Sequence, residues 1–224
     1  MHLVVDAALL RSAARAALRA TDRIQTAVRL AGAAERCVVD GWSGERAIRR
    51  AVPADVRAEG GVVLPGRLLY EVASRLEGAV TIRKSGSSVV LNTSPSAFLL
   101  RTVPADDFPA AVFDEVTAEG QALTLAGIDF ADLGQRAAPI AATDSSRPIL
   151  QGVCLRPGPD GTTVWATDGY RVLALERKGL VLGADAVVVE ARSLAEAARV
   201  AAGAEQVTLR VGAKAAWMEA QTGD

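Results

Sequence analysis

The chain has 224 residues, half of them apolar, and a formal net charge of −1. That content can fill two cores of about 100 residues each, and the balanced charge alone indicates no particular partner. The two cysteines stand in no metal-binding pattern, the N-terminus lacks a signal peptide, and no apolar run is long enough to span a membrane. We therefore expect a soluble cytoplasmic protein with two buried thiols, without disulfides or a bound metal.

The N-terminal segment predicts a short strand at residues 2–5 followed by a helix at 7–20. Asp6 is placed to cap this helix. Arg11, Arg15 and Arg19 recur at every fourth position, opposite a side rich in alanine, and Arg23 extends the row beyond the helix. Taken alone, such a row is more often a solvated face than a binding site.

The rest of the first half predicts strands around a second helix. The helix is expected at 65–76, with Pro65 in its first turn and Gly78 as a left-handed residue after its end. It carries Arg67 and Arg75, with Glu71 between them. The expected strands are residues 27–30, 36–39, 47–52, 62–64, 80–83, 88–92 and 97–101.

The second half repeats the first. Leu68 and the segment VTIR at 80–83 return as Leu194 and VTLR at 207–210, an offset of 126 to 127 residues. Helices are expected at 128–138, stopped by Pro139, and at 191–202. The expected strands are residues 122–126, 150–155, 162–166, 171–177, 186–189, 206–211 and 215–219. We predict two α+β domains with antiparallel sheets, at 1–117 and 118–224.

The second copy has no counterpart of residues 98–109, the closing strand and final loop of the first. A missing closing strand would leave an exposed sheet edge, which proteins normally avoid. This predicts either a fragment of a longer protein or a partner that covers the edge.

Catalytic chemistry is disfavoured. His2, the only histidine, is expected at a frayed or edge position, and no phosphate-binding loop motif occurs. The acidic pairs at 106–107 and 114–115 are interpreted as solvated side chains. A remote alternative is an enzyme with a carboxylate metal site that includes Asp107. Asp168 is expected to bond its own backbone in a turn. We predict no catalytic residue and no cofactor.

Three segments carry a resemblance to a known family. They are PADDFP at 104–109, SRPILQGV at 146–153 and ATDGYRV at 166–172. Together they closely resemble the bacterial sliding clamp, the β subunit of DNA polymerase III. The resemblance implies a DNA clamp fold of repeated domains, with sheets outside and two helices per domain on the inner face. It covers one complete domain and most of a second, and the third domain of the family is absent.

The resemblance implies a processivity factor, or a truncated or divergent copy of one, that tethers polymerase to duplex DNA through phosphate contacts independent of base sequence. Arg23 matches a DNA-contacting arginine of the family. The other expected DNA-binding residues lie on the helices: Arg11, Arg15, Arg19, Arg67, Arg75, Arg136, Arg192 and Arg199. Polymerase III, other polymerases, the clamp loader and repair factors are the implied protein partners. Self-association into a ring is left open, and a location at the nucleoid is implied.

The resemblance also implies a groove that captures short partner peptides. Its residues here would be Arg147, Leu150, Thr167, Tyr170, Arg171 and Val172. Without the resemblance, Leu150 and Val172 would be ordinary strand core and Tyr170 an aromatic residue in a turn. The alternative function is a clamp-like interaction module that keeps the groove and does not encircle DNA.

Overall fold

The computed structural model describes residues 1–44, 46–110, 112–115, 121–180, 185–211 and 216–221, without the side chains of 107, 114, 115, 121–123, 211, 216, 217 and 221. The chain forms two compact units, Met1–Phe113 and Asp114–Asp224. The proposed boundary after residue 117 lies outside the described residues. None of the described helices combines the length and apolar character needed to cross a bilayer.

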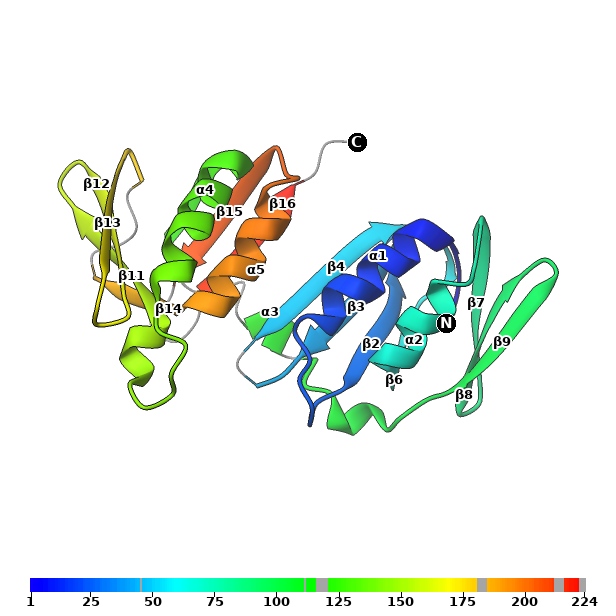
Figure 1. Cartoon of the computed structure of the whole chain (residues 1–224). Coiled ribbons are helices and arrows are strands. Elements are labelled where there is room, and N and C mark those ends of the chain that lie inside the picture. The colour runs from blue at the N-terminus through cyan, green and yellow to red at the C-terminus, as the bar shows by residue number, and fades with distance from the viewer. Residues whose placement is uncertain (45, 111, 116–120, 181–184, 212–215, 222–224) are drawn as a thin grey trace. The chain divides into compact units, whose positions relative to one another are not determined.

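Two antiparallel sheets build the first unit (Figure 1). Apolar residues alternate along the strands, so each sheet has one face in the core. The first sheet has the order β5-β1-β7-β8-β9, with the bounds Asp55–Ala58, His2–Asp6, Ala79–Ser85, Ser88–Thr93 and Ser96–Arg101. The second has the order β4-β3-β2-β6, with the bounds Ala47–Pro53, Arg36–Trp42, Ala27–Ala33 and Gly60–Pro65.

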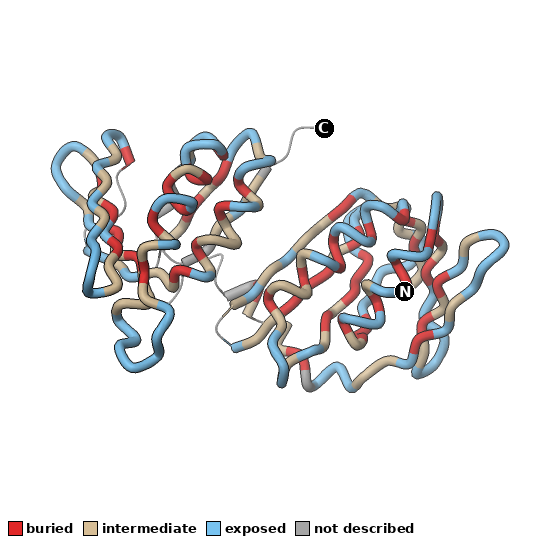
Figure 2. Tube along the Cα trace, in the orientation of Figure 1, coloured by how far each residue is buried: buried red, intermediate tan, exposed pale blue. Residues whose placement is uncertain are grey.

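Helices α1 (Ala7–Leu18) and α2 (Gly66–Ala73) lie side by side in this unit and share one core with both sheets. Figure 2 shows buried and exposed residues alternating along both helices. Small residues allow a close approach of α1 to the second sheet: a Cβ on Gly41 would lie 2.0 Å from the carbonyl oxygen of Ala17. The outer sides of the helices are left to solvent.

The second unit repeats this plan. Helices α4 (Gly127–Ala137) and α5 (Ala191–Ala201) pack closely, and a Cβ on Gly134 would lie 2.5 Å from the Cβ of Ala198. One sheet has the order β10-β15-β16, with the bounds Gln121–Ala126, Gln206–Val211 and Ala216–Gln221. The other has the order β13-β12-β11-β14, with the bounds Val172–Lys178, Gly161–Thr167, Gly152–Gly158 and Val187–Glu190.

Short helices complete the described chain. In the first unit η1 (Ala105–Asp107) follows β9, and α3 (Val112–Glu115) spans the boundary between the two units. The second contains η2 (Ala138–Ile140) and η3 (Pro148–Gln151). The expected α+β class with antiparallel sheets is confirmed.

Several expectations about local structure are confirmed. Asp6 caps α1, because its Oδ1 accepts bonds from the backbone N–H groups of Ala8 and Leu9 at 2.8 and 3.2 Å. Gly78 is left-handed as expected, with a φ of 66°, but it does not end the second helix, whose C-cap is Ser74. In each case the signal is a polar or glycine residue acting on its immediate neighbours.

Other expectations are wrong because they depend on distant parts of the chain. Leu68 is exposed while Leu69 is fully buried, so Leu69 is the counterpart of Leu194. His2 lies between β5 and β7 and not at a sheet edge. The expectation was wrong because β5, which pairs with β1, was not foreseen. Cys37 is buried, but Cys154 is only half-buried.

The ends of two elements also differ from expectation. Leu150 lies in η3, not in a strand, because Pro148 opens a short helical turn there. Pro139 does not end helical structure outright: α4 stops at Ala137, and the chain continues through Pro139 as η2. The second helix is shorter than expected and ends at Ala73.

Candidate functional site

The outer side of α1 carries exposed arginines. Its buried positions fall on one side of the helix, so Arg11 and Arg15 are left exposed on the other. Arg19 follows the last helical residue as the C-cap and is half-buried. The predicted row therefore has two exposed members on the helix and a third, more enclosed one at its end.

Arg23 lies in a turn that Asp22 holds in place. The Oδ1 atom of Asp22 accepts bonds from the backbone N–H groups of Ile24 and Gln25, both at 2.7 Å. These bonds lower the pKa of the Asp22 carboxyl. Arg23 is exposed in this turn, next to Ile24, whose side chain is also exposed.

The arginines of α2 differ from one another. Arg67 Nε donates to Glu71 Oε1 at 3.2 Å, one turn along the helix. Arg75 is exposed beyond the helix end. Helices α1 and α2 together hold three arginines and one glutamate, so their outer side is positively charged.

The helices of the second unit are more nearly balanced. Arg136 Nε donates to Asp132 Oδ1 at 2.7 Å, and Asp132 also pairs with Arg177. The bond from Arg136 is the largest cause of the lowered pKa of the Asp132 carboxyl. Arg199 pairs with Glu196. Helices α4 and α5 hold three arginines and three acidic residues, which leaves no net charge.

Five of the nine candidate arginines have no ion-pair partner among the residues that the structure describes. These five are Arg11, Arg15, Arg23, Arg75 and Arg192. An arginine without an internal carboxylate keeps its full charge available to an anion in solution. The four that belong to the first unit form the more cationic set.

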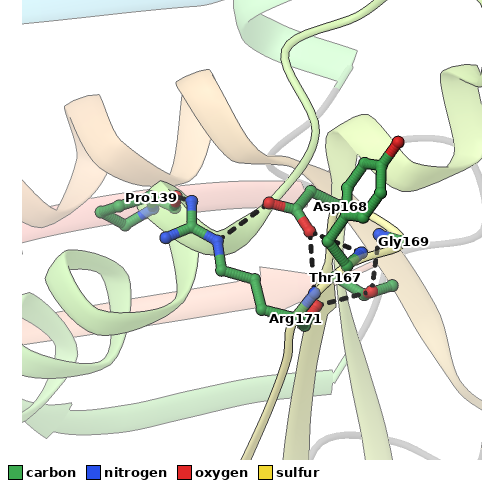
Figure 3. A network of polar contacts seen from close by, with 6 residues as sticks. Pro139, Thr167, Asp168, Gly169 and Arg171 are labelled. Atoms are coloured by element: carbon green, nitrogen blue, oxygen red, sulfur yellow. Dashed lines mark hydrogen bonds and ion pairs between the residues drawn. The ribbon is translucent and has the colours of Figure 1, made fainter.

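A second set of candidate residues meets at the turn between β12 and β13 (Figure 3). Asp168 Oδ1 accepts from the backbone N–H groups of Tyr170 and Arg171, at 2.9 and 3.0 Å. Its Oδ2 accepts from Arg171 Nε at 2.9 Å. These bonds lower the pKa of Asp168 to about 2, with the bond from Tyr170 the largest cause. The expectation that Asp168 bonds its own turn is confirmed.

Two further contacts fix the turn. Thr167 Oγ1 donates to the Arg171 carbonyl at 2.8 Å and accepts from the Gly169 N–H at 3.0 Å. Arg171 Nη2 donates to the Pro139 carbonyl at 2.9 Å, which ties the turn to η2. Figure 3 shows the Arg171 guanidinium between Pro139 and Asp168. The arginine is thus occupied inside the protein, as an anchor of the turn.

Arg147 also reaches this turn. A Cβ on Gly169 would lie 2.9 Å from Arg147 Nη1, and Gly169 has a φ of 94°, so a side chain there would be strained and crowded. Leu150, three residues after Arg147, bonds back to it through its backbone N–H at 3.0 Å. Leu150 is half-buried.

The turn presents apolar side chains to solvent. Tyr170 is 94% exposed and Val172 is 66% exposed, which rules out the alternative of Val172 as strand core. Ile149 of η3 is also exposed, at 68%, and was missed in the sequence. Its only sequence signal was its place between Pro148 and Leu150 in a matched motif.

The residues considered for catalysis do not gather. Among the described residues no three or more His, Cys, Asp or Glu side chains are grouped so that they could hold a metal ion. The side chains of Asp107, Asp114 and Glu115 lie outside the described ones. His2 accepts a bond from Arg83 Nε at 3.1 Å, and desolvation and the charge of Arg83 lower its pKa.

Comparison with known proteins gives a consistent result. Residues 7–112 match the family described as the DNA polymerase III beta subunit, N-terminal domain. Beta sliding clamps of Micrococcus luteus and Synechocystis are 32% and 31% identical, each over 69% of this chain and over 50% and 44% of their own lengths. The chain thus spans about half the length of these curated relatives.

Solved structures agree on the fold. A sliding clamp from Bacillus subtilis is similar with a TM-score of 0.90 at 18% identity, over 98% of this chain and 62% of its own. A DNA polymerase III subunit beta from Pseudomonas aeruginosa gives 0.88 at 21% identity, over 99% and 63%.

Proposed function

We propose, on the premise that this chain belongs to the family of bacterial β sliding clamps, that it is a processivity factor that tethers DNA polymerase to duplex DNA. In this proposal it makes contacts to phosphates that do not depend on base sequence and binds partner peptides on its second unit. It catalyses no reaction. The observation that carries the proposal is the set of exposed arginines without internal partners on and beside α1 and α2.

The DNA-binding part rests on the chemistry of these arginines. A protein that slides must bind the backbone without reading bases, and phosphate-directed arginines do this. We assign the main contacts to Arg11, Arg15, Arg23, Arg75 and Arg192. A smaller contribution is proposed for the enclosed Arg19 and for Arg67, Arg136 and Arg199, because each of the last three must leave a carboxylate before it can meet a phosphate.

The peptide-binding part rests on the turn between β12 and β13. Tyr170 and Val172 offer apolar surface that a short peptide could bury, and Leu150 lies in the neighbouring η3. We propose that Thr167 and Arg171 act by holding the turn, and that Arg147 forms its polar rim. Peptides from polymerase III, other polymerases, the clamp loader and repair factors are the proposed ligands.

The remaining assignments follow from family membership. We propose that residues 1–117 and 118–224 are the first and second clamp domains, and that the protein acts at the nucleoid in the cytoplasm. Ring closure with further copies of the chain would supply the topological link to DNA.

A second candidate function is an interaction module that binds partner peptides and does not encircle DNA. The balanced charge of α4 and α5 favours it, because a channel lined on all sides by DNA-binding helices should be positive throughout.

Affinity for short duplexes of different sequence separates the two functions. A clamp should bind them equally and lose affinity steeply between about 50 and 200 mM salt, since each phosphate contact releases counterions. An interaction module should bind DNA weakly or with little dependence on salt.

The peptide groove has its own test. A clamp-binding polymerase peptide should lose affinity on Tyr170→Ala and on Leu150→Ala, and Leu99→Ala, an exposed apolar residue of the first unit, is the control. Equal affinity of both groove variants and the parent would show that the peptide binds elsewhere.

A further inference from the structure

One carboxylate of the second unit serves two arginines. Asp132 lies on α4, where its Oδ1 accepts from Arg136 Nε at 2.7 Å, one turn along the helix. Its other oxygen, Oδ2, accepts from Nη2 of Arg177, which lies on β13, 45 residues away in the chain. Each oxygen of Asp132 is therefore bonded to a different guanidinium group.

The two arginines are placed differently. The Arg136 side chain is 60% exposed on the outer side of α4, whereas that of Arg177 is 31% exposed. Half-buried and exposed positions alternate along β13, and Arg177 shares its side of the strand with Leu173 and Leu175, which pack against the core. Arg136 can therefore reach an anion in solution, while Arg177 stays on the core side of the sheet.

The ion pair on α2 lacks this second cation. Arg67 Nε donates to Glu71 Oε1, again across one turn of a helix, and the Arg67 side chain is exposed. Within the part of the chain that the structure describes, no other cation pairs with Glu71. The two helices thus carry the same kind of pair, with and without a second arginine on the carboxylate.

The second arginine changes what remains when the first one leaves. When Arg67 turns away to bind a phosphate, Glu71 stays behind as an unpaired negative charge that repels this phosphate. When Arg136 turns away, Asp132 keeps Arg177 and remains part of a neutral pair. The release of Arg136 therefore leaves no uncompensated negative charge beside the phosphate.

We propose that Arg177 is a positioning residue that neutralises Asp132 and so frees Arg136 to contact a DNA phosphate. The inference rests on the proposed DNA binding and deepens it, because it separates Arg136 from the other arginines that pair with a carboxylate. Arg136 still gives up one bond on binding, so its contribution to affinity stays below that of an unpaired arginine such as Arg11. Arg177 acts through Asp132 and touches no DNA.

The slope of log affinity against log salt for a short duplex tests the proposal, since each phosphate contact adds about 0.9 to it. Arg136→Ala should reduce the slope by about 0.9, whereas Arg67→Ala should change it little. Arg177→Gln should also reduce it by about 0.9, because Asp132 then holds Arg136. Lys178→Gln is the control: it removes the same charge from the next, exposed position of β13 and should leave the slope of the parent.

Asp132→Asn separates positioning from a purely structural role. It removes the charge that holds Arg136, so the slope should stay close to that of the parent. Adding Arg177→Gln to this variant should then change nothing. A loss of DNA binding that comes only from poorer folding would persist in the double variant.

A titration of Asp132 by NMR gives a readout without DNA. Arg136 is the largest cause of the lowered pKa of Asp132, and Arg177 lowers it as well. In Arg136→Ala the pKa should rise but remain below the usual Asp value, because Arg177 stays on the carboxylate. Adding Arg177→Gln should raise the pKa further.

Several results would overturn the inference. They are a parental slope for Arg177→Gln, an equal loss for Lys178→Gln, and a loss that persists in the Asp132→Asn background. Equal slopes for Arg136→Ala and Arg67→Ala would also contradict it, and that comparison needs no change at Arg177. A parent whose duplex binding does not depend on salt would overturn the proposed function instead. The titration then still decides the inference, which falls if adding Arg177→Gln leaves the pKa of Asp132 unchanged.

Discussion

The buried carboxylate of Asp40 provides a stringent test of how the first unit is held together. It accepts bonds from Arg29 Nη1 at 3.0 Å, Arg49 Nε at 2.8 Å and Arg49 Nη2 at 3.2 Å. Asp40→Asn keeps the volume but removes the charge, so the guanidinium groups of Arg29 and Arg49 lose the buried carboxylate that they share. Breaking a buried ion pair in this way costs about 3 to 5 kcal/mol.

The expected cost here is smaller. The Arg29 and Arg49 side chains are 31% and 37% exposed, so both can recover part of their hydration once the carboxylate is gone. We expect a loss of about 2 kcal/mol, which raises the population of the opened first unit about 30-fold.

Cys37 provides the assay, because it lies in the same strand as Asp40 and is buried. In a Cys154→Ser background, the rate of Cys37 modification under native conditions follows the opened population when closing is fast. Asp55→Asn is the matched control: its partner Arg57 and Asp55 itself are both more than half exposed, so the rate should hardly change. A rate for Asp40→Asn within about threefold of the parent would refute the reasoning, since the ion pairs would then contribute little.

Two more predictions concern the second unit. Gly134→Ala should lower the free energy of unfolding and the thermal midpoint, because the new Cβ would lie 2.5 Å from the Cβ of Ala198 and the helices must separate. Gly203→Ala is the control, because a Cβ there meets nothing, and it should leave the thermal midpoint unchanged. Equal midpoints of the two variants in calorimetry would contradict this prediction. The second prediction is a titration of Asp168, whose pKa of about 2 lies below the usual Asp value of about 3.9. The ionised carboxylate therefore stabilises the turn above about pH 4, and this contribution is lost as the pH falls towards 2. NMR shifts of the Tyr170 amide should titrate near pH 2, and a midpoint near 4 would show that the bonds to Asp168 do not form.

The features that could be predicted from the sequence are those that depend on interactions between residues close together in the chain. The Asp6 cap, the left-handed Gly78 and the Asp168 turn depend on neighbours a few residues away, and each was foreseen. The antiparallel α+β class was foreseen for a related reason, because alternation along strands and the repeat of VTIR as VTLR are patterns in the chain itself.

The features that were missed depend on distant residues. The place of His2 inside a sheet requires β5, and the burial of Leu69 instead of Leu68 requires the exact rotation of α2 against the core. Helical spacing placed Arg67, Arg136 and Arg199 on the outer sides of helices. The acidic neighbours Glu71 and Glu196 were visible in the sequence, but the bonds themselves depend on side-chain geometry.

The sharing of Asp132 by two arginines was also beyond the sequence. Arg177 lies 45 residues after Asp132, and the two meet only in the folded second unit. Similarly, Phe108 follows η1 and Phe113 lies in α3, and nothing local indicated that they cover a sheet.

The proposed DNA binding depends most on contacts between DNA phosphates and the arginines of α1 and its following turn. The slope of log affinity against log salt for a short duplex tests this directly, comparing the parent, a triple Ala variant at Arg11, Arg15 and Arg23, and a control triple Ala variant at three exposed cations carried by strands. The control positions are Arg36, Lys84 and Arg101.

Both variants lose the same charge, so only the position of the charge differs. If the arginines of α1 and its turn contact phosphates, their removal should reduce the slope by about 2.7, at about 0.9 for each contact, while the control slope stays close to that of the parent. An equal reduction in both variants, or none in either, would contradict the assignment of the DNA contacts to this face.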